Sequence, residues 1–149
     1  MASTRVALLA VNMLVALFFP YHVHHDLAHY WFADHRHQGW ATCPLTENGL
    51  IRVACQQPSD DLLVRPADII GHLQRFCRDK HYRAWTDTVS LNDTALFAPQ
   101  FIRGPQQLTD VYLLGLAKKM GGGLATFDRT IPVKAVRGAT ADTLHVIEP

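Results

Sequence analysis

Three acidic residues stand where an apolar segment of the chain ends or begins: Glu47, Asp110 and Asp128. Each follows a threonine by one or two positions, and these threonines are Thr46, Thr109 and Thr126. A carboxylate at the edge of a buried segment is costly unless it is paired or holds a cation. The three sites therefore predict acids that converge on a hard metal ion.

The chemistry that such a site supports is hydrolysis of a phosphodiester. Mg²⁺ and Mn²⁺ favour carboxylate and water oxygens, and a cation held by acids can position water for attack and neutralise charge on the phosphate. The sequence has no GxSxG motif, no P-loop and no cysteine with an evident histidine partner. From the residues alone two alternatives stay open: ordinary helix-start or strand-end carboxylates, or a phosphatase or DNase built on the same acids.

The first junction of this type lacks its acid. Residues 8–12, Leu-Leu-Ala-Val-Asn, have the same build as the other junctions, but Ala10 stands where a fourth carboxylate would fit. Alanine supplies no oxygen ligand, so a cation at this site would lack one of its four acidic ligands.

Composition limits the class of protein. The chain has 149 residues, 48% hydrophobic and 18% charged, which is typical of one globular domain over residues 1–149. A formal net charge of +1 gives no global attraction to nucleic acid, so such binding needs a local patch. Cys43, Cys55 and Cys77 form no CxxC pair, which indicates neither a disulfide framework nor a zinc site and favours the reduced cytoplasm.

The apolar opening of the chain, residues 6–19, could be mistaken for an export signal or a membrane span. It is shorter than the ~20 residues that a span needs, and Asn12 interrupts it. Arg5 is its only basic flank, and Pro20 follows it in place of a small-residue cleavage site. We expect a buried strand that runs into a helix, with no membrane association.

Short apolar segments alternate with amphipathic ones along the chain. We expect strands at residues 6–9, 40–43, 124–127 and 143–147, and a weaker one within 82–89. Helices are expected at 12–19, at 24–37, from Pro44 until Pro58, from Pro66 through Cys77, and from a Thr109 cap to Gly121. In the last two helices, Ile70 and Met120 are among the residues expected to face the core. The alternation predicts an α/β fold with a mostly parallel sheet and a cleft beyond the carboxyl ends of its strands.

Four blocks of sequence carry a resemblance to a known family. They are residues 8–12 (LLAVN), 43–49 (CPLTENG), 107–114 (QLTDVYLL) and 124–129 (LATFDR). In this order they resemble the motif blocks of PIN-domain ribonucleases, and more narrowly those of VapC-type toxins of bacterial toxin–antitoxin operons. The resemblance, which runs over residues 6–131, implies a three-layer α/β/α sandwich that cleaves RNA with Mg²⁺ or Mn²⁺ and metal-activated water. It also implies a homodimer and a small cognate antitoxin.

The resemblance also implies roles for single residues. Glu47, Asp110 and Asp128 match three of the family's four metal-binding acids, and the supporting polar positions are Asn12, Thr46, Thr109 and Thr126. Ala10 stands where the family has its first metal-binding aspartate, which implies an inactive chain. Two origins stay open. We favour deliberate replacement that silences a toxic enzyme, because alanine is the usual truncation; the other is a natural degenerate copy that binds antitoxin or RNA as a regulator.

Three sets of cationic residues each have a functional and a structural interpretation. His22, His24, His25 and His29 could bind zinc, but no cysteine or acid completes the set, so we favour a polar helix start near the cleft that contacts RNA. Arg129 could contact a substrate phosphate or pair with a local acid. A third group is expected to be a solvated helix end rather than an RNA-binding patch: Arg75, Arg78, Lys80 and Arg83.

The first helices are more apolar than one buried face requires. We expect most of the aromatic residues to lie in the core. Some of Phe18, Phe19 and Tyr21 could instead form a groove for an antitoxin helix.

Overall fold

A computed structural model describes residues 5–56 and 64–149 of the chain. One five-stranded sheet runs through it, with strands β1 (Ala7–Leu9), β2 (Trp40–Thr42), β3 (Tyr82–Ala84), β4 (Gly123–Thr126) and β5 (Leu144–Val146). The strand order is β3-β2-β1-β4-β5, and each of these pairings is parallel. The carboxyl ends of the strands therefore meet at one edge of the sheet.

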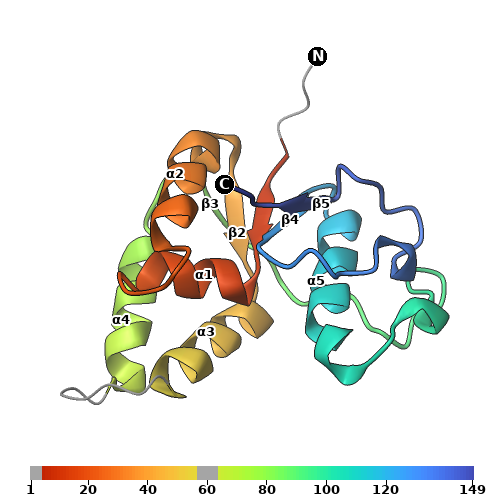
Figure 1. Ribbon diagram of the computed structural model, residues 1–149, viewed down its shortest axis with the longest axis horizontal. Helices are drawn as coiled ribbons and strands as arrows, with labels where there is room; N and C mark the ends of the chain where they lie inside the picture. Colours follow the sequence, from red (N-terminus) through yellow and green to blue (C-terminus); the bar gives the residue numbers. More distant parts are fainter. Residues whose placement is uncertain (1–4, 57–63) are drawn as a thin grey trace.

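Helices cover both faces of this sheet. The α-helices of the described part are α1 (Val11–Phe18), α2 (His25–His35), α3 (Pro44–Gln56), α4 (Pro66–Phe76) and α5 (Leu108–Lys119). Short 3-10 turns are η1 (Arg36–Gln38), η2 (Pro99–Phe101), η3 (Pro105–Gln107) and η4 (Val133–Ala135). Figure 1 shows α1–α4 gathered on one side of the sheet and α5 on the other.

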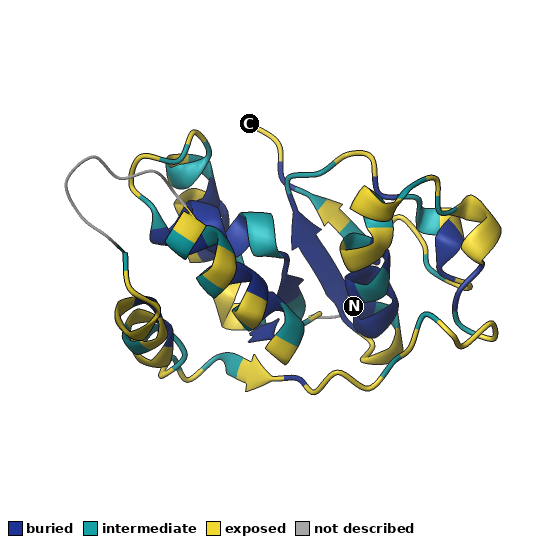
Figure 2. Cartoon of the chain, turned by 90° about the horizontal axis from the view of Figure 1, so that it is seen from below, coloured by how far each residue is buried: buried dark blue, intermediate teal, exposed yellow. Residues whose placement is uncertain are grey.

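The two sides of the sheet form separate buried cores. Leu9, Trp40 and Ala125 pack with α1–α4, and the neighbouring Leu8 and Leu124 pack with α5. Successive side chains of a strand point to opposite faces, so each central strand contributes to both cores. Figure 2 shows these strands buried between the two groups of helices, whereas the edge strand β3 is largely exposed. This arrangement confirms the predicted α/β/α sandwich with a parallel sheet.

Proline and glycine set the element boundaries as predicted. Helix α1 ends at Phe18, two residues before Pro20, and Pro44 and Pro66 are the first residues of α3 and α4. Gly39, at φ 98°, reverses the chain between η1 and β2, a backbone angle that favours glycine. The predicted stop of α3 at Pro58 lies outside the described residues.

Three expectations for α4 and α5 are wrong. Gln107, not Thr109, is the N-cap of α5, because the turn η3 leads straight into the helix and Thr109 falls in its first turn. Met120 is 44% exposed because it lies at the C-cap, beyond the last buried turn. Ile70 is 40% exposed, whereas its neighbour Ile69 and Leu73 bury the inner face of α4.

Two further observations concern membrane helices and the cysteines. Among the residues that the structure describes, no helix is long and apolar enough to cross a membrane. Cys43, Cys55 and Cys77 are free thiols.

Candidate active site

The four predicted junctions all lie at the carboxyl edge of the sheet. Ala10 directly follows β1, Glu47 lies in the first turn of the helix that follows β2, Asp110 lies in the first turn of α5, and Asp128 follows β4 by two residues. Ala10 is fully buried and is the N-cap residue of α1, with φ −65° and ψ 163°. Its amide donates to the carbonyl of Ala125 in β4 at 3.0 Å, which fixes it beside the strand that leads to Asp128.

Asp110 and Asp128 form a pair of neighbouring carboxyl groups. Burial, and after it the charge and hydrogen bonding of Asp128, raise the pKa of Asp110 to about 6. Two carboxylates that share a partly buried site resist ionising together. A cation between them would relieve that repulsion, so the pair has the character of a metal-binding position.

Asp128 is held in place by hydrogen bonds from its own loop and from α1. Its Oδ1 accepts from the Thr130 amide at 2.8 Å and from the Thr130 hydroxyl at 2.7 Å. Its amide donates to Thr126 Oγ1 at 3.1 Å, and Asn12 Nδ2 donates to the same oxygen at 2.9 Å. Asn12 Oδ1 in turn accepts from the Phe127 amide at 3.2 Å. Asn12 and Thr126 thus orient the segment that carries Asp128.

Glu47 is held separately from this pair. Its Oε2 accepts from Thr42 Oγ1 at 2.8 Å and lies 3.5 Å from the Tyr82 hydroxyl, and these two hydroxyls are 2.7 Å apart. Glu47 lines a hollow with Ile70 of α4 and its neighbours, on the side of the sheet that α1–α4 cover. Within residues 5–56 and 64–149, no three acidic, histidine or cysteine side chains are close enough to hold a metal ion. The structure therefore brings two of the three predicted acids together and gives the third two hydroxyl partners.

The two remaining threonines have different positions. Thr46 is buried, and its hydroxyl accepts from the Cys43 amide at 3.0 Å and donates to the Cys43 carbonyl at 2.9 Å. These bonds order the first turn of α3, from which Glu47 projects. Thr109 is exposed in the first turn of α5.

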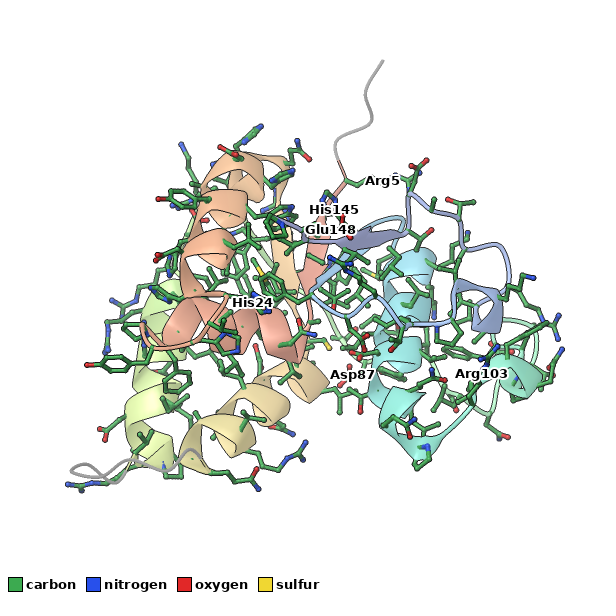
Figure 3. All side chains as sticks on the ribbon, in the orientation of Figure 1. Arg5, His24, Asp87, Arg103, His145 and Glu148 are labelled. Carbon is green, nitrogen blue, oxygen red and sulfur yellow. The ribbon has the colours of Figure 1, made fainter. Side chains whose placement is uncertain are left out.

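Asp87 is a fourth acid at this edge that the sequence analysis missed. Its Oδ2 accepts from the Leu45 amide at 3.2 Å, which places a carboxylate at the N-terminus of α3. Its charge and hydrogen bonding contribute to the raised pKa values of Cys43 and Tyr112, so it lies between α3 and α5 (Figure 3). The available signal was an acid three residues after a strand, but that strand was only weakly marked. Burial raises the pKa of the Cys43 thiol to about 11, which excludes it as a thiolate nucleophile at neutral pH.

Within residues 5–56 and 64–149, the histidines around the start of α2 belong to no group of three or more His, Cys, Asp or Glu residues that could hold a metal ion. His25 Nδ1 is hydrogen-bonded to the Ala16 carbonyl at 2.7 Å, and His29 Nε2 to the Leu17 carbonyl at 2.8 Å. Both carbonyls belong to the last turn of α1, where the helix itself provides no amide partner. His24 stacks on Phe127 with ring centroids 4.6 Å apart. His24 therefore lies beside the segment that carries Asp128 (Figure 3).

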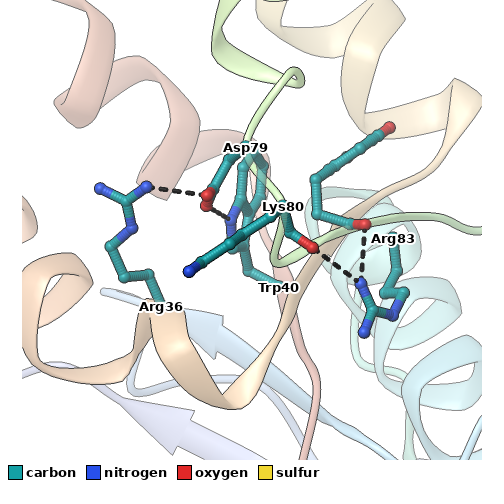
Figure 4. Close-up of polar contacts among 6 residues, drawn as sticks. Arg36, Trp40, Asp79, Lys80 and Arg83 are labelled. Atoms are coloured by element: carbon teal, nitrogen blue, oxygen red, sulfur yellow. Dashed lines mark hydrogen bonds and ion pairs between the residues drawn. The ribbon is translucent and has the colours of Figure 1, made fainter.

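The cationic side chains near the edge have local partners. Arg129 Nε lies 3.2 Å from Glu148 Oε1, with both side chains well exposed, so one of the two alternatives left open for Arg129, pairing with an acid, is present. Arg83 lies within β3, and its guanidinium donates to the carbonyls of Lys80 and Tyr82 at 3.4 and 3.1 Å (Figure 4). These contacts to backbone carbonyls agree with the expected solvated surface after α4 rather than with an RNA-binding patch.

The same close-up shows how β2 and β3 are joined at their start. Asp79 accepts from Trp40 Nε1 at 2.7 Å and pairs with Arg36 at 2.8 Å (Figure 4). Both partners help to hold the pKa of Asp79 below its ordinary value although burial opposes this. This junction aligns the strands that carry Thr42 and Tyr82, the partners of Glu47.

Comparison with known proteins identifies the family. No family model matches the chain. Ribonuclease VapC44 of Mycobacterium tuberculosis is 38% identical to it over 141 residues, which covers 95% of the chain and 99% of the relative. The chain belongs to the VapC ribonuclease family. Ribonuclease VapC39 of the same organism is 35% identical over 132 residues, covering 89% of the chain and 95% of the relative. Ribonuclease VapC38 is 40% identical over 123 residues, covering 83% and 85%.

Membership of the VapC family confirms the resemblance seen in the four sequence blocks. The α/β/α sandwich is also the fold that the PIN resemblance implies.

Proposed function

We propose that this VapC chain is the toxin component of a toxin–antitoxin pair and has the fold of an endoribonuclease that Ala10 silences. The observation that carries this proposal is the pair of carboxyls of Asp110 and Asp128 at the sheet edge, next to a strand end where Ala10 provides no oxygen. The ribonuclease names of the relatives support RNA as the substrate class. The cytoplasm is the compartment that free cysteines favour.

The residues present fit a hard divalent cation. Asp110 and Asp128 would hold Mg²⁺ or Mn²⁺ through carboxylate oxygens, with Glu47 as a further acid of the same edge. When bound, such an ion would activate water and neutralise charge on the phosphodiester. Position 10 suits an aspartate, because its extended N-cap backbone is the conformation in which aspartate is among the preferred residues.

The chain's own residues supply orientation and substrate contacts. Thr130, Thr126 and Asn12 fix the direction of Asp128. Arg129 can exchange its exposed pairing with Glu148 for a phosphate, because an exposed ion pair contributes little free energy.

The proposed partners are a small cognate antitoxin and a second copy of the chain. Phe18 is buried and stacks on His72 with centroids 4.2 Å apart, so it belongs to the core rather than to a docking groove. Tyr21, Val23 and Tyr30 are 100%, 86% and 72% exposed around the connection from α1 to α2 and form a candidate contact surface.

A second candidate function is a degenerate PIN domain that binds antitoxin or RNA without cleaving it. The buried alanine at position 10 favours it, because a chain that never held a cation has no use for an acid there. The two candidates differ in what restoring the acid does.

The test is the Ala10→Asp variant. We expect it to cleave RNA with Mg²⁺ or Mn²⁺ and to arrest bacterial growth when expressed without an antitoxin, whereas the parent chain does neither. Loss of a mere supporting contact reduces metal affinity or activity about 10–100-fold, so restoring a direct ligand should have at least that effect. A chelator and an added Asp110→Asn change should each stop cleavage. A folded Ala10→Asp protein that leaves a broad RNA panel intact with either ion would refute the nuclease and favour the binding-only function.

A further inference from the structure

A hollow of about 540 Å³ opens on the far side of α5 from α3. It is formed where η2, η3 and η4 meet, and its lining includes Phe101, Arg103, Gln107, Thr130 and Lys134. Figure 3 shows Arg103 beyond α5, away from the helices of the other face. We call this hollow the η2–η4 groove.

The η2–η4 groove adjoins the acid pair, because its lining residue Thr130 is hydrogen-bonded to Asp128. Gln107 Nε2 donates to the Thr130 carbonyl at 3.3 Å across the groove. The Thr130 hydroxyl and amide both donate to Asp128 Oδ1. Gln107 also precedes Asp110 by three residues, slightly less than one helical turn. A chain lying in the groove would therefore lie next to the segments that carry the two carboxyls.

The chemistry of the groove lining is cationic and aromatic. Arg103 and Lys134 are its charged residues, both are exposed, and no acid lines it with them. Phe101 is 41% exposed and presents a flat ring to the same space. Grooves that bind single-stranded nucleic acid combine these two features, because cations attract the phosphates and aromatic rings stack on the bases.

Two other hollows of the described structure carry acids beside their cations. The one at the amino edge of the sheet has both Arg5 and Asp142 among its lining residues. The one beside the C-terminal half of α5 places Asp87 and Asp93 among its cations. Acids in the lining repel a polyanion, so the η2–η4 groove is the better match for RNA.

We propose that the η2–η4 groove binds single-stranded RNA next to the phosphodiester presented to Asp110 and Asp128. Phe101 stacks on a base, and Arg103 and Lys134 contact phosphates. This assignment rests on the proposed ribonuclease function, because it assumes that the phosphodiester to be cleaved lies at Asp110 and Asp128. It adds a recognition surface to that site.

The test measures binding of a labelled single-stranded RNA of mixed sequence to the parent chain in metal-free buffer, by fluorescence anisotropy. Binding without cleavage suits the parent chain, since Ala10 keeps it silent. We expect Phe101→Ala to weaken binding about 5- to 100-fold, Phe101→Tyr to bind like the parent, and Phe101→Leu to bind like the alanine variant. Arg103→Ala and Lys134→Ala should each reduce the slope of log affinity against log salt by about 0.7.

Matched controls remove the same kinds of side chain elsewhere. Met120→Ala removes a large exposed apolar side chain at the C-cap of α5, and Arg52→Ala removes an exposed cation from α3. Both should leave RNA affinity within about twofold of the parent, and thermal melting should show that every variant is folded. The proposal is overturned if the parent chain binds no RNA, or if the Phe101, Arg103 and Lys134 variants change binding no more than the controls.

Failure of the groove and failure of the ribonuclease function give different results. If Ala10→Asp cleaves RNA but the groove variants bind as the parent does, the groove is wrong and the nuclease stands. If the groove variants lose binding but Ala10→Asp cleaves nothing, the groove stands as an RNA-binding surface and the nuclease is wrong.

Discussion

Two regions of the same sheet edge surround their acidic side chains with different neighbours. Asp110 and Asp128 have each other as neighbours, and burial together with this proximity raises the pKa of Asp110. Glu47 has two hydroxyls, of Thr42 and Tyr82, that can donate to it. Hydroxyl donors stabilise an ionised carboxylate without a cation, whereas a second carboxylate destabilises it. A bound cation would therefore relieve the repulsion within the Asp110–Asp128 pair, whereas Glu47 already has hydroxyl partners of its own.

The largest expected effect is on the rate of RNA cleavage, which should fall more when an acid of the Asp110–Asp128 pair is replaced than when Glu47 is replaced. In the Ala10→Asp background, Asp110→Asn or Asp128→Asn should reduce RNA cleavage by more than about 100-fold, because each removes a charged oxygen from the proposed metal position. Glu47→Gln should reduce it by about 10–100-fold, the range for a residue that acts mainly through its neighbours. Initial rates at saturating Mg²⁺ measure this, and a Glu47→Gln loss as large as the aspartate losses would break the comparison.

A smaller effect concerns stability and pH. The pKa of Asp110 rises from 3.8 to about 6 on folding, so the folded chain binds a proton more readily than the unfolded chain between these values. Stability therefore falls as pH rises from about 4 to 6, and the penalty is fully present at pH 7. Asp110→Asn should raise the free energy of unfolding at pH 7 by on the order of 1–3 kcal/mol, reduced by partial exposure.

Urea unfolding of the metal-free parent and the Asp110→Asn variant at pH 7 and at pH 4 measures this effect. The difference between them should shrink toward zero at pH 4, where Asp110 is protonated in the folded chain. An equal difference at both pH values would show that the substitution acts through packing instead of charge.

The smallest expected effect is the coupling of Glu47 to its hydroxyl partner. A double-mutant cycle of Thr42→Val and Glu47→Ala should give a coupling free energy of about 1–2 kcal/mol, since a hydrogen bond to a charged group is lost in each single variant. The same cycle between Glu47→Ala and Asp110→Asn should be additive within about 0.5 kcal/mol. Strong coupling in the second cycle would show that the two regions form one cluster in solution.

Much of the fold was predictable because its signals are local. Pro20 follows the end of α1, Pro44 and Pro66 begin α3 and α4, and the residues of β1 and β4 are buried on both faces as central parallel strands require. The positions of Ala10 and Asp128 at the carboxyl edge follow from these elements alone.

The contacts of the site were harder to predict because they join distant segments. The partners of Glu47 lie on β2 and on β3, and β3 is a short, exposed edge strand with a weak pattern. Asp87 was missed for the same reason. The Thr109 cap failed because η3 enters α5 without a side-chain cap, which depends on backbone geometry that the motif does not encode.

The most direct test of the central claim is calorimetric titration of Mn²⁺ into the parent chain and into Ala10→Asp at pH 7. The account predicts that Ala10→Asp binds Mn²⁺ at least about 10-fold more tightly than the parent. Adding Asp110→Asn should remove that gain, and Glu47→Gln should keep most of it. Equal affinities in the parent and Ala10→Asp, or a gain that survives Asp110→Asn, would contradict a metal position shared by residue 10 and the acid pair.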